Sequence, residues 1–173
     1  ANRLSKDPSN RVLLLEAGGS DRRFYIQMPI GYGKTYHQKA VNWMYMTEPS
    51  PDAGNRPSYW PRGKVLGGSS SINAMVYVRG NPKDFDDWYE AGNPGWSFDE
   101  LLPYFKRMET WQHGSDDYRG GDGPLKVSDV SSQLHPLCKN FISAAKEIGF
   151  SFNKDMNGAS QEGVGHYQIT THN

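Results

Sequence analysis

PRGKVLGGSSSINAMVYVRG, residues 61–80, carries the strongest signal in the sequence. Gly67 and Gly68 have no side chains, so the main chain there can approach a ligand closely. Ser69 opens a run of three serines, a residue type favoured where a helix begins, and a helix N-terminus attracts anions. Arg62 and Lys64 add positive charge nearby. We therefore expect a phosphate-binding turn, with a pyrophosphate as candidate ligand.

The residues that flank this turn are apolar, which argues against a flexible Gly/Ser linker. We expect these side chains to be buried: Val65, Leu66, Ile72, Ala74, Met75, Val76 and Val78. Asn73 is an isolated amide among them, and a buried amide needs hydrogen-bond partners. Two interpretations stay open for Asn73, a contact with a cofactor ring or a turn.

A second informative stretch is RVLLLEAGG, residues 11–19. The unbroken apolar run Val12–Leu15 predicts a strand buried on both faces of a parallel sheet, with its partner upstream. Glu16 follows it, where the Rossmann arrangement has its ribose-binding acid about 20 residues after a G-x-G-x-x-G turn. The alternative is a solvated acid at a strand end. GHYQITTHN, residues 165–173, predicts another strand that reaches the end of the sequence. Together with the missing upstream partner of the first strand, it predicts that the chain begins and ends inside larger motifs.

Composition narrows the function classes. The 173 residues carry 19 Lys and Arg against 19 Asp and Glu, so general binding of nucleic acid is not expected. The single cysteine, Cys138, cannot form an internal disulfide, which favours the cytoplasm. His135 lies three residues before it, but no further ligand accompanies them and no metal site is predicted. No apolar run is long enough for a transmembrane segment, and no signal peptide is evident.

Three helices are predicted in the second half of the chain. Asn81-Pro82 begins the first, which ends near Gly92. The sequence 97–100 is a capping box, with Trp96 and Leu101 as a hydrophobic staple, and Pro103 predicts a kink in the helix that follows. Apolar residues recur at helical spacing over 136–149, which predicts a helix with ordinary core packing.

At the 61–80 stretch the chain resembles the glucose-methanol-choline (GMC) flavoprotein oxidoreductases. The signature of that family is matched by Gly63, Lys64, Leu66, Gly67-Gly68, Ser69-Ser70, Ile72-Asn73, Tyr77, Gly80 and Asp86. The resemblance continues through LEAGG (15–19), NWMYMTEP (42–49), GNPGWSFDELLPYFKRMET (92–110) and GDGPLKVS (121–128), and so covers nearly the whole chain. The similarity is greatest to the bacterial choline-dehydrogenase-like branch.

The resemblance implies an α/β fold. Residues 1–23 would be part of a Rossmann-like FAD-binding domain with a parallel sheet, and residues 24–61 a lid loop over the cofactor. Residues 62–90 would form the FAD-binding signature segment and a helix. Residues 91–173 would begin a substrate-binding domain of α+β character. The lid aromatics, Tyr32, Tyr36, Trp43 and Tyr45, would either shape an apolar passage to the flavin or pack the lid.

The cofactor implied is FAD. Glu16 would accept hydrogen bonds from both ribose hydroxyls, and a carboxylate there would repel a 2′-phosphate. Main-chain groups near the pyrophosphate and the flavin edge would come from the signature, so the expected binding residues are Glu16, Val65, Gly67, Gly68, Ser69, Asn73, Ala74, Met75 and Val76. Some family members join the flavin to a histidine immediately before the signature asparagine. Because Ile72 stands there, non-covalent FAD is expected.

The implied reaction is oxidation of a primary alcohol, choline-like or aromatic, with hydride transfer to FAD and then to oxygen or another acceptor. The family's base is a histidine in a later motif, expected beyond residue 173, so no catalytic residue is assigned here. The histidines of this chain do not match that motif: His37, His113, His135, His166 and His172. Two alternatives remain: an inactive FAD-binding or structural fragment lacking the remainder of the enzyme, and a hydroxynitrile lyase of the same fold.

Overall fold

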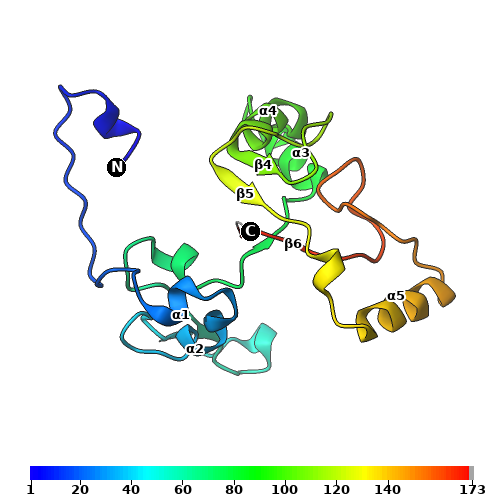
Figure 1. The fold of residues 1–173 in the computed structure, drawn as a ribbon, viewed down its shortest axis with the longest axis horizontal. Helices are drawn as coiled ribbons and strands as arrows, with labels where there is room; N and C mark the ends of the chain where they lie inside the picture. Colours follow the sequence, from blue (N-terminus) through cyan, green and yellow to red (C-terminus); the bar gives the residue numbers. More distant parts are fainter. Residues whose placement is uncertain (172–173) are drawn as a thin grey trace. The chain divides into compact units, whose positions relative to one another are not determined.

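A computed structural model describes residues 1–171. The chain divides into two compact units, Ala1–Ala74 and a second that begins at Met75. Helices and short sheets, one of them parallel, alternate along the chain (Figure 1), and the fold is α/β as expected. His172 and Asn173, the last two residues of the predicted C-terminal strand, lie outside the described residues.

The first unit consists of short elements around a small core. Its 3₁₀ helices and α-helices are Leu4–Lys6, α1 (Phe24–Gln27), Pro29–Gly31, α2 (Tyr32–Thr35), Pro51–Ala53 and Gly68–Ser71. Strands β1 (Tyr45–Met46) and β2 (Tyr59–Trp60) pair antiparallel. The core consists of Val41, Val65 and Ile72, with Ile26 packed against it. The signature stretch therefore supplies two of the three buried core residues.

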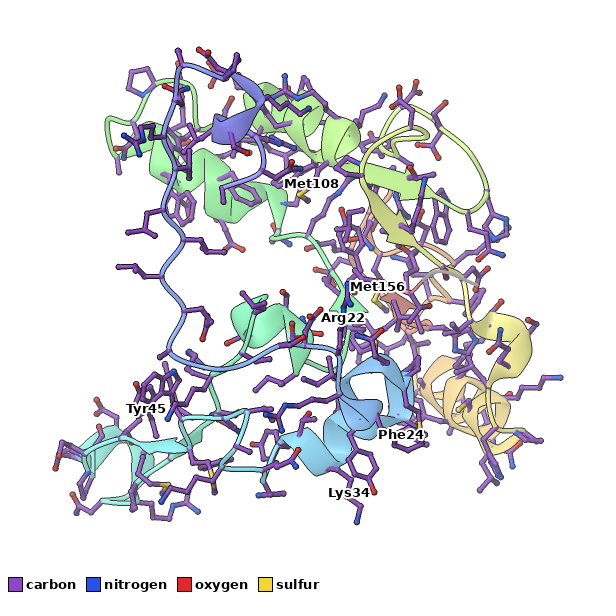
Figure 2. The ribbon with its side chains drawn as sticks, turned by 60° about the vertical axis from the view of Figure 1, so that its left-hand side comes forward. Arg22, Phe24, Lys34, Tyr45, Met108 and Met156 are labelled. Carbon is purple, nitrogen blue, oxygen red and sulfur yellow. The ribbon has the colours of Figure 1, made fainter. Side chains whose placement is uncertain are left out.

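The predicted strand at Val12–Leu15 is not formed. The run is extended but unpaired, and its side chains are exposed, with Leu13 82% accessible (Figure 2, blue ribbon). A strand inside a parallel sheet takes hydrogen bonds from neighbours on both sides. No segment among residues 1–171 pairs with this run. The composition of the run is that of a buried strand. Burial also requires neighbouring strands or helices to cover it, and residues 1–171 supply none.

Residues 24–61, expected as a lid loop, contain the β1–β2 hairpin. The side chain of Asn42 bonds several parts of this segment together. This side chain is buried and donates to Tyr36 O (2.8 Å) and Tyr59 Oη (3.1 Å). Its Oδ1 accepts from the main-chain N–H of Met44 and of Arg62, both at 2.9 Å. One buried amide therefore connects the residues before β1 with β2 and the residue pair that follows it, while the role of the segment as a lid stays a prediction.

The second unit contains the longer helices. Its elements are β3 (Val76–Tyr77), α3 (Pro82–Glu90), α4 (Phe98–Met108), β4 (Glu109–Trp111), β5 (Leu125–Val127), a 3₁₀ helix (Ser131–Gln133), α5 (Leu137–Glu147) and β6 (Gln168–Ile169). β4 and β5 are parallel, β3 and β6 antiparallel, and an isolated bridge between Ser128 and Ile169 links the two pairs. Tyr77, Trp111 and Val127 form the core.

The predicted helix ends are confirmed. Asn81 caps α3 in a capping box with Asp84, and Gly92 beyond its end has φ 93°. Ser97 and Glu100 form the predicted box at α4, which continues through Pro103. The longest helices have 11 residues, and none among residues 1–171 is long and apolar enough to cross a bilayer.

Replacing Ser97 by alanine should lower the free energy of unfolding by about 1 kcal/mol, because the Glu100 N–H at the start of α4 loses its capping acceptor. Thermal or urea unfolding measures the change. Ser115→Ala, in an exposed loop, is the matched control and should leave stability unchanged. Equal melting points for all three proteins would contradict a stabilising role of the cap.

Helix α5 forms where it was predicted, but its expected core packing is wrong. Leu137, Phe141 and Ile148 are exposed, Phe141 by 70%. Spacing at 3.6 residues identifies which face of a helix is apolar. It does not provide the layer that covers that face, and none of the described residues buries these three side chains.

Candidate functional site

The two segments expected at a dinucleotide meet in the first unit. Gly19 forms a parallel bridge with Val65, and Leu66 N–H donates to Gly19 O at 2.9 Å. A Cβ placed on Gly18 would overlap the carbonyl oxygen of Lys64, so only glycine permits this approach. The turn after Glu16 and the signature stretch therefore lie side by side, as the ribose and pyrophosphate roles require.

The Gly67-Gly68 turn has the predicted open main chain but not the predicted helix. Gly67 and Gly68 have φ of 89° and 58°, and a Cβ on Gly68 would have no atom within 4 Å. The three serines form one four-residue 3₁₀ turn, Gly68–Ser71, rather than the start of a long helix. The helix-dipole argument for anion binding therefore fails, and what remains is exposed glycine backbone.

Serine hydroxyls close this turn instead of pointing to a ligand. Ser70 Oγ donates to Gly67 O, and Ser71 Oγ donates to Leu66 O at 2.7 Å. Ser69 Oγ accepts from Gly63 N–H at 3.1 Å. Serine suits these positions because its short hydroxyl reaches main-chain groups in or beside the same turn.

Glu16 is exposed at the end of the extended run. One of its oxygens accepts from Gly18 N–H at 2.7 Å, which orients the carboxylate over the turn that contacts the signature. A carboxylate has about four acceptor positions, so capacity for two further donors remains. This geometry is compatible with a diol such as ribose.

Residues 76–80 alternate between exposed and buried positions, where the sequence predicted general burial of the apolar side chains. Ile72 and Tyr77 are buried, whereas Val76 and Val78 are exposed. Alternation is the pattern of a strand that is covered on one side. The other predicted flavin-edge residues, Asn73 and Ala74, are exposed at the end of the first unit, so the expectation of a buried Asn73 amide is wrong.

Met75, at the start of the second unit, has φ 61°. A residue with a side chain occupies this left-handed region at a free-energy cost of about 1–3 kcal/mol, and such outliers gather at functional sites. The strain lies next to β3, among the residues expected at the flavin edge.

The aromatic residues of the expected lid pack against one another. The rings of Trp43 and Tyr45 stack at 5.9 Å, and Tyr36 contacts Tyr59 edge-on at 5.1 Å (Tyr45 is labelled in Figure 2). The two cations expected near the pyrophosphate lie over aromatic rings, Lys64 over Trp43 and Arg62 over Trp60. Tyr36, Trp43 and Tyr45 are each still more than a third exposed, and none belongs to the core. Whether they pack the lid or shape a passage to the flavin stays a prediction.

A buried ionic cluster in the second unit was not predicted. Glu109 Oε1 accepts from Arg79 Nη2 and Arg119 Nε, each at 2.8 Å, and both Glu109 and Arg119 are fully buried. Arg119 Nη1 also donates to Asp155 Oδ2 and Gln168 Oε1 at 2.8 Å. Two arginines and two carboxylates thus balance each other's charge.

The cluster shifts the pKa values of two of its members. Burial alone would raise the pKa of Asp155, but hydrogen bonds from Arg119, the Asn157 N–H and Gln168 outweigh it and hold that pKa below its ordinary value. Burial alone would lower the pKa of Arg119, but its bonds to Glu109 and Asp155 raise it. Both groups therefore stay charged at neutral pH.

The signature acid Asp86 has a structural contact. Its Oδ1 accepts from the N–H of Phe98, the first residue of α4, at 3.0 Å, and so joins α3 to α4. This contact accounts for an acidic residue at that position, so no contact between Asp86 and a ligand needs to be assumed.

Each described histidine has a local partner, and none is assigned as a catalytic base. His37 stacks on Tyr59, His113 pairs with Asp129 at 3.0 Å, and His135 accepts from the Leu137 N–H. His166 contacts the ring of Phe152, and His172 lies outside the described residues. Within residues 1–171 no group of three or more His, Cys, Asp or Glu side chains is placed to hold a metal ion.

The family profile and two individual relatives that match this chain all describe oxidoreductases. Residues 14–173 match the profile described as GMC oxidoreductase. The chain is 47% identical over 171 residues to the oxygen-dependent choline dehydrogenase of Photobacterium profundum, covering 98% of this chain and 30% of that protein. It is 49% identical over 171 residues to an alcohol dehydrogenase [acceptor] of Pseudomonas putida, covering 98% of this chain and 31% of that protein.

Among solved structures, the pyridoxine 4-oxidase from Mesorbium loti superposes with a TM-score of 0.90 at 35% identity, over 98% of this chain and 33% of that one. The chain thus spans about a third of the length of the relatives it matches.

Proposed function

The chain belongs to the GMC oxidoreductase family, and we propose that the full-length protein is an FAD-dependent oxidoreductase acting on primary alcohols, choline-like or aromatic. The single observation that carries the proposal is the approach of the Glu16–Gly19 turn to the signature stretch, with glycine required at Gly18. Family membership adds the chemistry that this geometry alone does not specify.

Each part of the cofactor has a matching group in this chain. Glu16 would hold the adenosine ribose, and the main chain of Gly67-Gly68 together with Ser69 would lie along the pyrophosphate. Val65, which was predicted to contact FAD as well, is fully buried in the core and would support this turn from behind. The exposed Asn73, Ala74 and Val76 and the adjoining Met75 would contact the flavin edge. Gly68 N–H already donates to Val65 O at 2.8 Å, so the exposed backbone of Gly67 and the residues that follow the turn would face the pyrophosphate.

In the proposed reaction bound FAD supplies the hydride acceptor. The alcohol proton needs a base, and the described histidines are engaged elsewhere in surface pairs and ring contacts. We place the base in the remainder of the protein. The electron acceptor is oxygen or another oxidant, and the cytoplasmic location stays a prediction from the single cysteine.

Anaerobic mixing of the full-length holoprotein with choline and with benzyl alcohol tests the proposal. An alcohol oxidoreductase bleaches its visible flavin band when the substrate is oxidised. Flavin that remains oxidised while a cyanohydrin is cleaved would identify a hydroxynitrile lyase instead. A full-length protein without bound flavin would support an inactive or structural role.

Replacing Glu16 by alanine should raise the dissociation constant for FAD about tenfold or more, because charge-assisted hydrogen bonds to the two ribose hydroxyls are lost. Titration of the full-length apoprotein with FAD, followed by flavin fluorescence, measures the change. Glu48→Ala, an exposed glutamate of the same unit, is the matched control and should bind FAD as the wild type does. Unchanged affinity in Glu16→Ala would remove the ribose role.

Denaturing the holoprotein should release all of its flavin into the soluble fraction. Ile72 occupies the position of the family's linking histidine, has no nucleophilic atom, and is buried against Val41 and Val65. Acid precipitation followed by absorbance of pellet and supernatant makes the measurement. Flavin retained in the washed pellet would show a covalent bond at another residue.

A further inference from the structure

The carbonyl of Met75 is held by strand β6 and its extension. Thr170 donates to Met75 O twice, from its N–H at 2.8 Å and from its Oγ1 at 3.3 Å. The next pairs of the ladder are Val76 with Ile169 and Tyr77 with Gln168. A residue with positive φ persists only where its surroundings hold it in place. The β3–β6 ladder is therefore the local restraint on the strained Met75 backbone.

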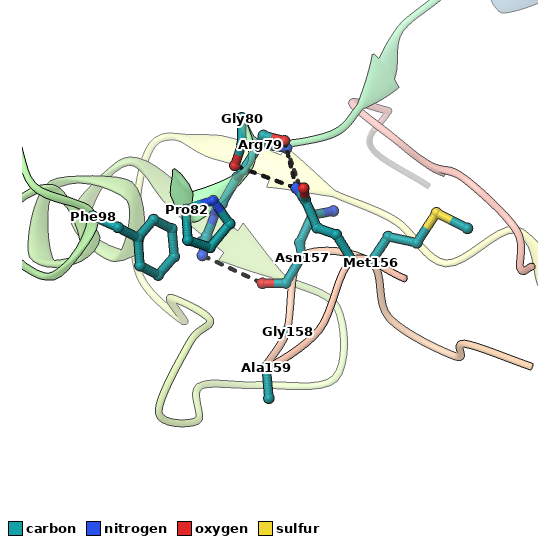
Figure 3. A pocket seen from close by; sticks show the side chains of 9 residues that line it. Arg79, Gly80, Pro82, Phe98, Met156, Asn157, Gly158 and Ala159 are labelled. Carbon is teal, nitrogen blue, oxygen red and sulfur yellow. Dashed lines mark hydrogen bonds between the residues drawn. The ribbon is translucent and has the colours of Figure 1, made fainter. Parts of the chain in front are cut away.

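The buried amide of Asn157 connects this ladder to the rest of the unit. Its Oδ1 accepts from Arg79 N–H at 2.8 Å, and its Nδ2 donates to Tyr77 O at 3.1 Å, so one side chain bonds the main chain on either side of Val78. Figure 3 shows Asn157 facing Arg79. The same Nδ2 donates to Gln168 Oε1 on β6 at 3.0 Å.

Asn157 is itself fixed by the buried ionic cluster. Its main-chain N–H donates to Asp155 Oδ1 at 2.9 Å, and Asp155 pairs with Arg119. Gln168 contacts both Asp155 and Arg119. The amide is thus almost fully buried, with every hydrogen-bonding group engaged, and it touches both strands of the ladder. A side chain so placed sets the register of two strands rather than simply filling space.

We propose that Asn157 is a positioning residue for the flavin: it holds β3 against β6, so that Met75 and Val76 present their main chain to the cofactor in one conformation. The inference rests on the proposed function, since it takes Met75 and Val76 as flavin contacts. It assigns to the loop between α5 and β6 a role in cofactor binding, although none of its residues was expected at the site.

The test uses full-length holoenzyme with Asn157→Leu, which keeps the side-chain size and removes the amide. We expect the FAD dissociation constant to rise about tenfold and the visible flavin band to shift. Asn157→Asp keeps an acceptor for Arg79 N–H but turns a second acceptor toward Tyr77 O and Gln168 Oε1, and should raise the dissociation constant at least as much as leucine does. Thr170→Val, which removes only the hydroxyl, should shift the band in the same direction, and Thr170→Ser should restore it.

Ser97→Ala separates positioning from stability. It destabilises the same unit through a helix cap whose hydrogen bonds go to Glu100 and not to β3, β6 or Asn157, and should leave both the FAD affinity and the flavin band as in the wild type. If Asn157→Leu and Thr170→Val, folded by circular dichroism, bind FAD within twofold of wild type with an unshifted band, the inference is wrong while the proposed function stands. If Asn157→Leu does not fold, the Thr170 pair decides. A wild-type protein without flavin overturns both.

Discussion

Replacing Arg119 by methionine should lower the free energy of unfolding by about 3–5 kcal/mol, because Glu109 would be left buried with only part of its charge balanced. Methionine approximates the length of the arginine stem, so the loss reports charge and hydrogen bonds more than volume. Urea unfolding followed by tryptophan fluorescence is a direct measurement, since the ring of Trp111 lies 4.2 Å from the guanidinium.

Lys83→Met is the matched control for that experiment. It removes a cation of the same unit whose partner, Asp87, is also at hydrogen-bond distance, 2.7 Å, but on an exposed helix face. Water screens such a pair, so no measurable change in stability is expected. Similar losses of unfolding free energy in both variants would show that burial does not increase the contribution of these ion pairs to stability.

Acid should reduce the difference between Arg119→Met and the wild type. The folded-state pKa of Asp155 is lowered, so the stabilisation from this carboxylate is complete above its unfolded pKa and is lost as the pH falls through the folded value. Unfolding measured at neutral pH and in strongly acidic solution should show the two proteins converging. A difference that widens with acid would contradict the sign of the shift.

Replacing Gly18 by alanine should destabilise the first unit by about 3 kcal/mol and abolish measurable FAD binding by the full-length protein. The added methyl group would overlap the carbonyl oxygen of Lys64, and main chain cannot move aside as a flexible side chain can. Separating the two segments breaks the Gly19–Val65 bridge and moves Glu16 away from the signature. Thermal unfolding and FAD titration together measure both effects.

Gly33→Ala is the control for Gly18→Ala. Gly33 lies in α2, and a Cβ there would meet no atom within 4 Å. Alanine favours helix over glycine, so this variant should be as stable as the wild type or slightly more so. Equal destabilisation by both substitutions would mean that the close approach at Gly18 is not a constraint.

The helix ends and the glycine turn could be predicted because their causes are local. A capping box is completed within three residues, as at Ser97 and Glu100, and positive φ at Gly67 and Gly68 follows from a turn that the neighbouring serines close. The signature also predicted the family, which the comparisons confirm. Which residues contact FAD stays a prediction, since family membership and geometry support it only indirectly.

The buried cluster could not be predicted because its members are far apart in sequence. Arg79 and Glu109 are 30 positions apart and Arg119 and Asp155 are 36 apart, and nothing near one member indicates its partner. Charged residues are usually exposed, so composition favoured the wrong interpretation for Arg119 and Glu109. The opposite error occurred at Val12–Leu15 and α5, where apolar patterns predicted burial that the described residues do not provide.

The amino-acid sequence alone therefore determined the family, the ends of the three longer helices and the place of the glycine turn, because each depends on residues within a few positions of one another. Only the tertiary structure decided which glycine must stay glycine, which charges are buried and which apolar faces are covered. Those properties depend on atoms that folding brings together from distant positions, such as Lys64 O beside Gly18.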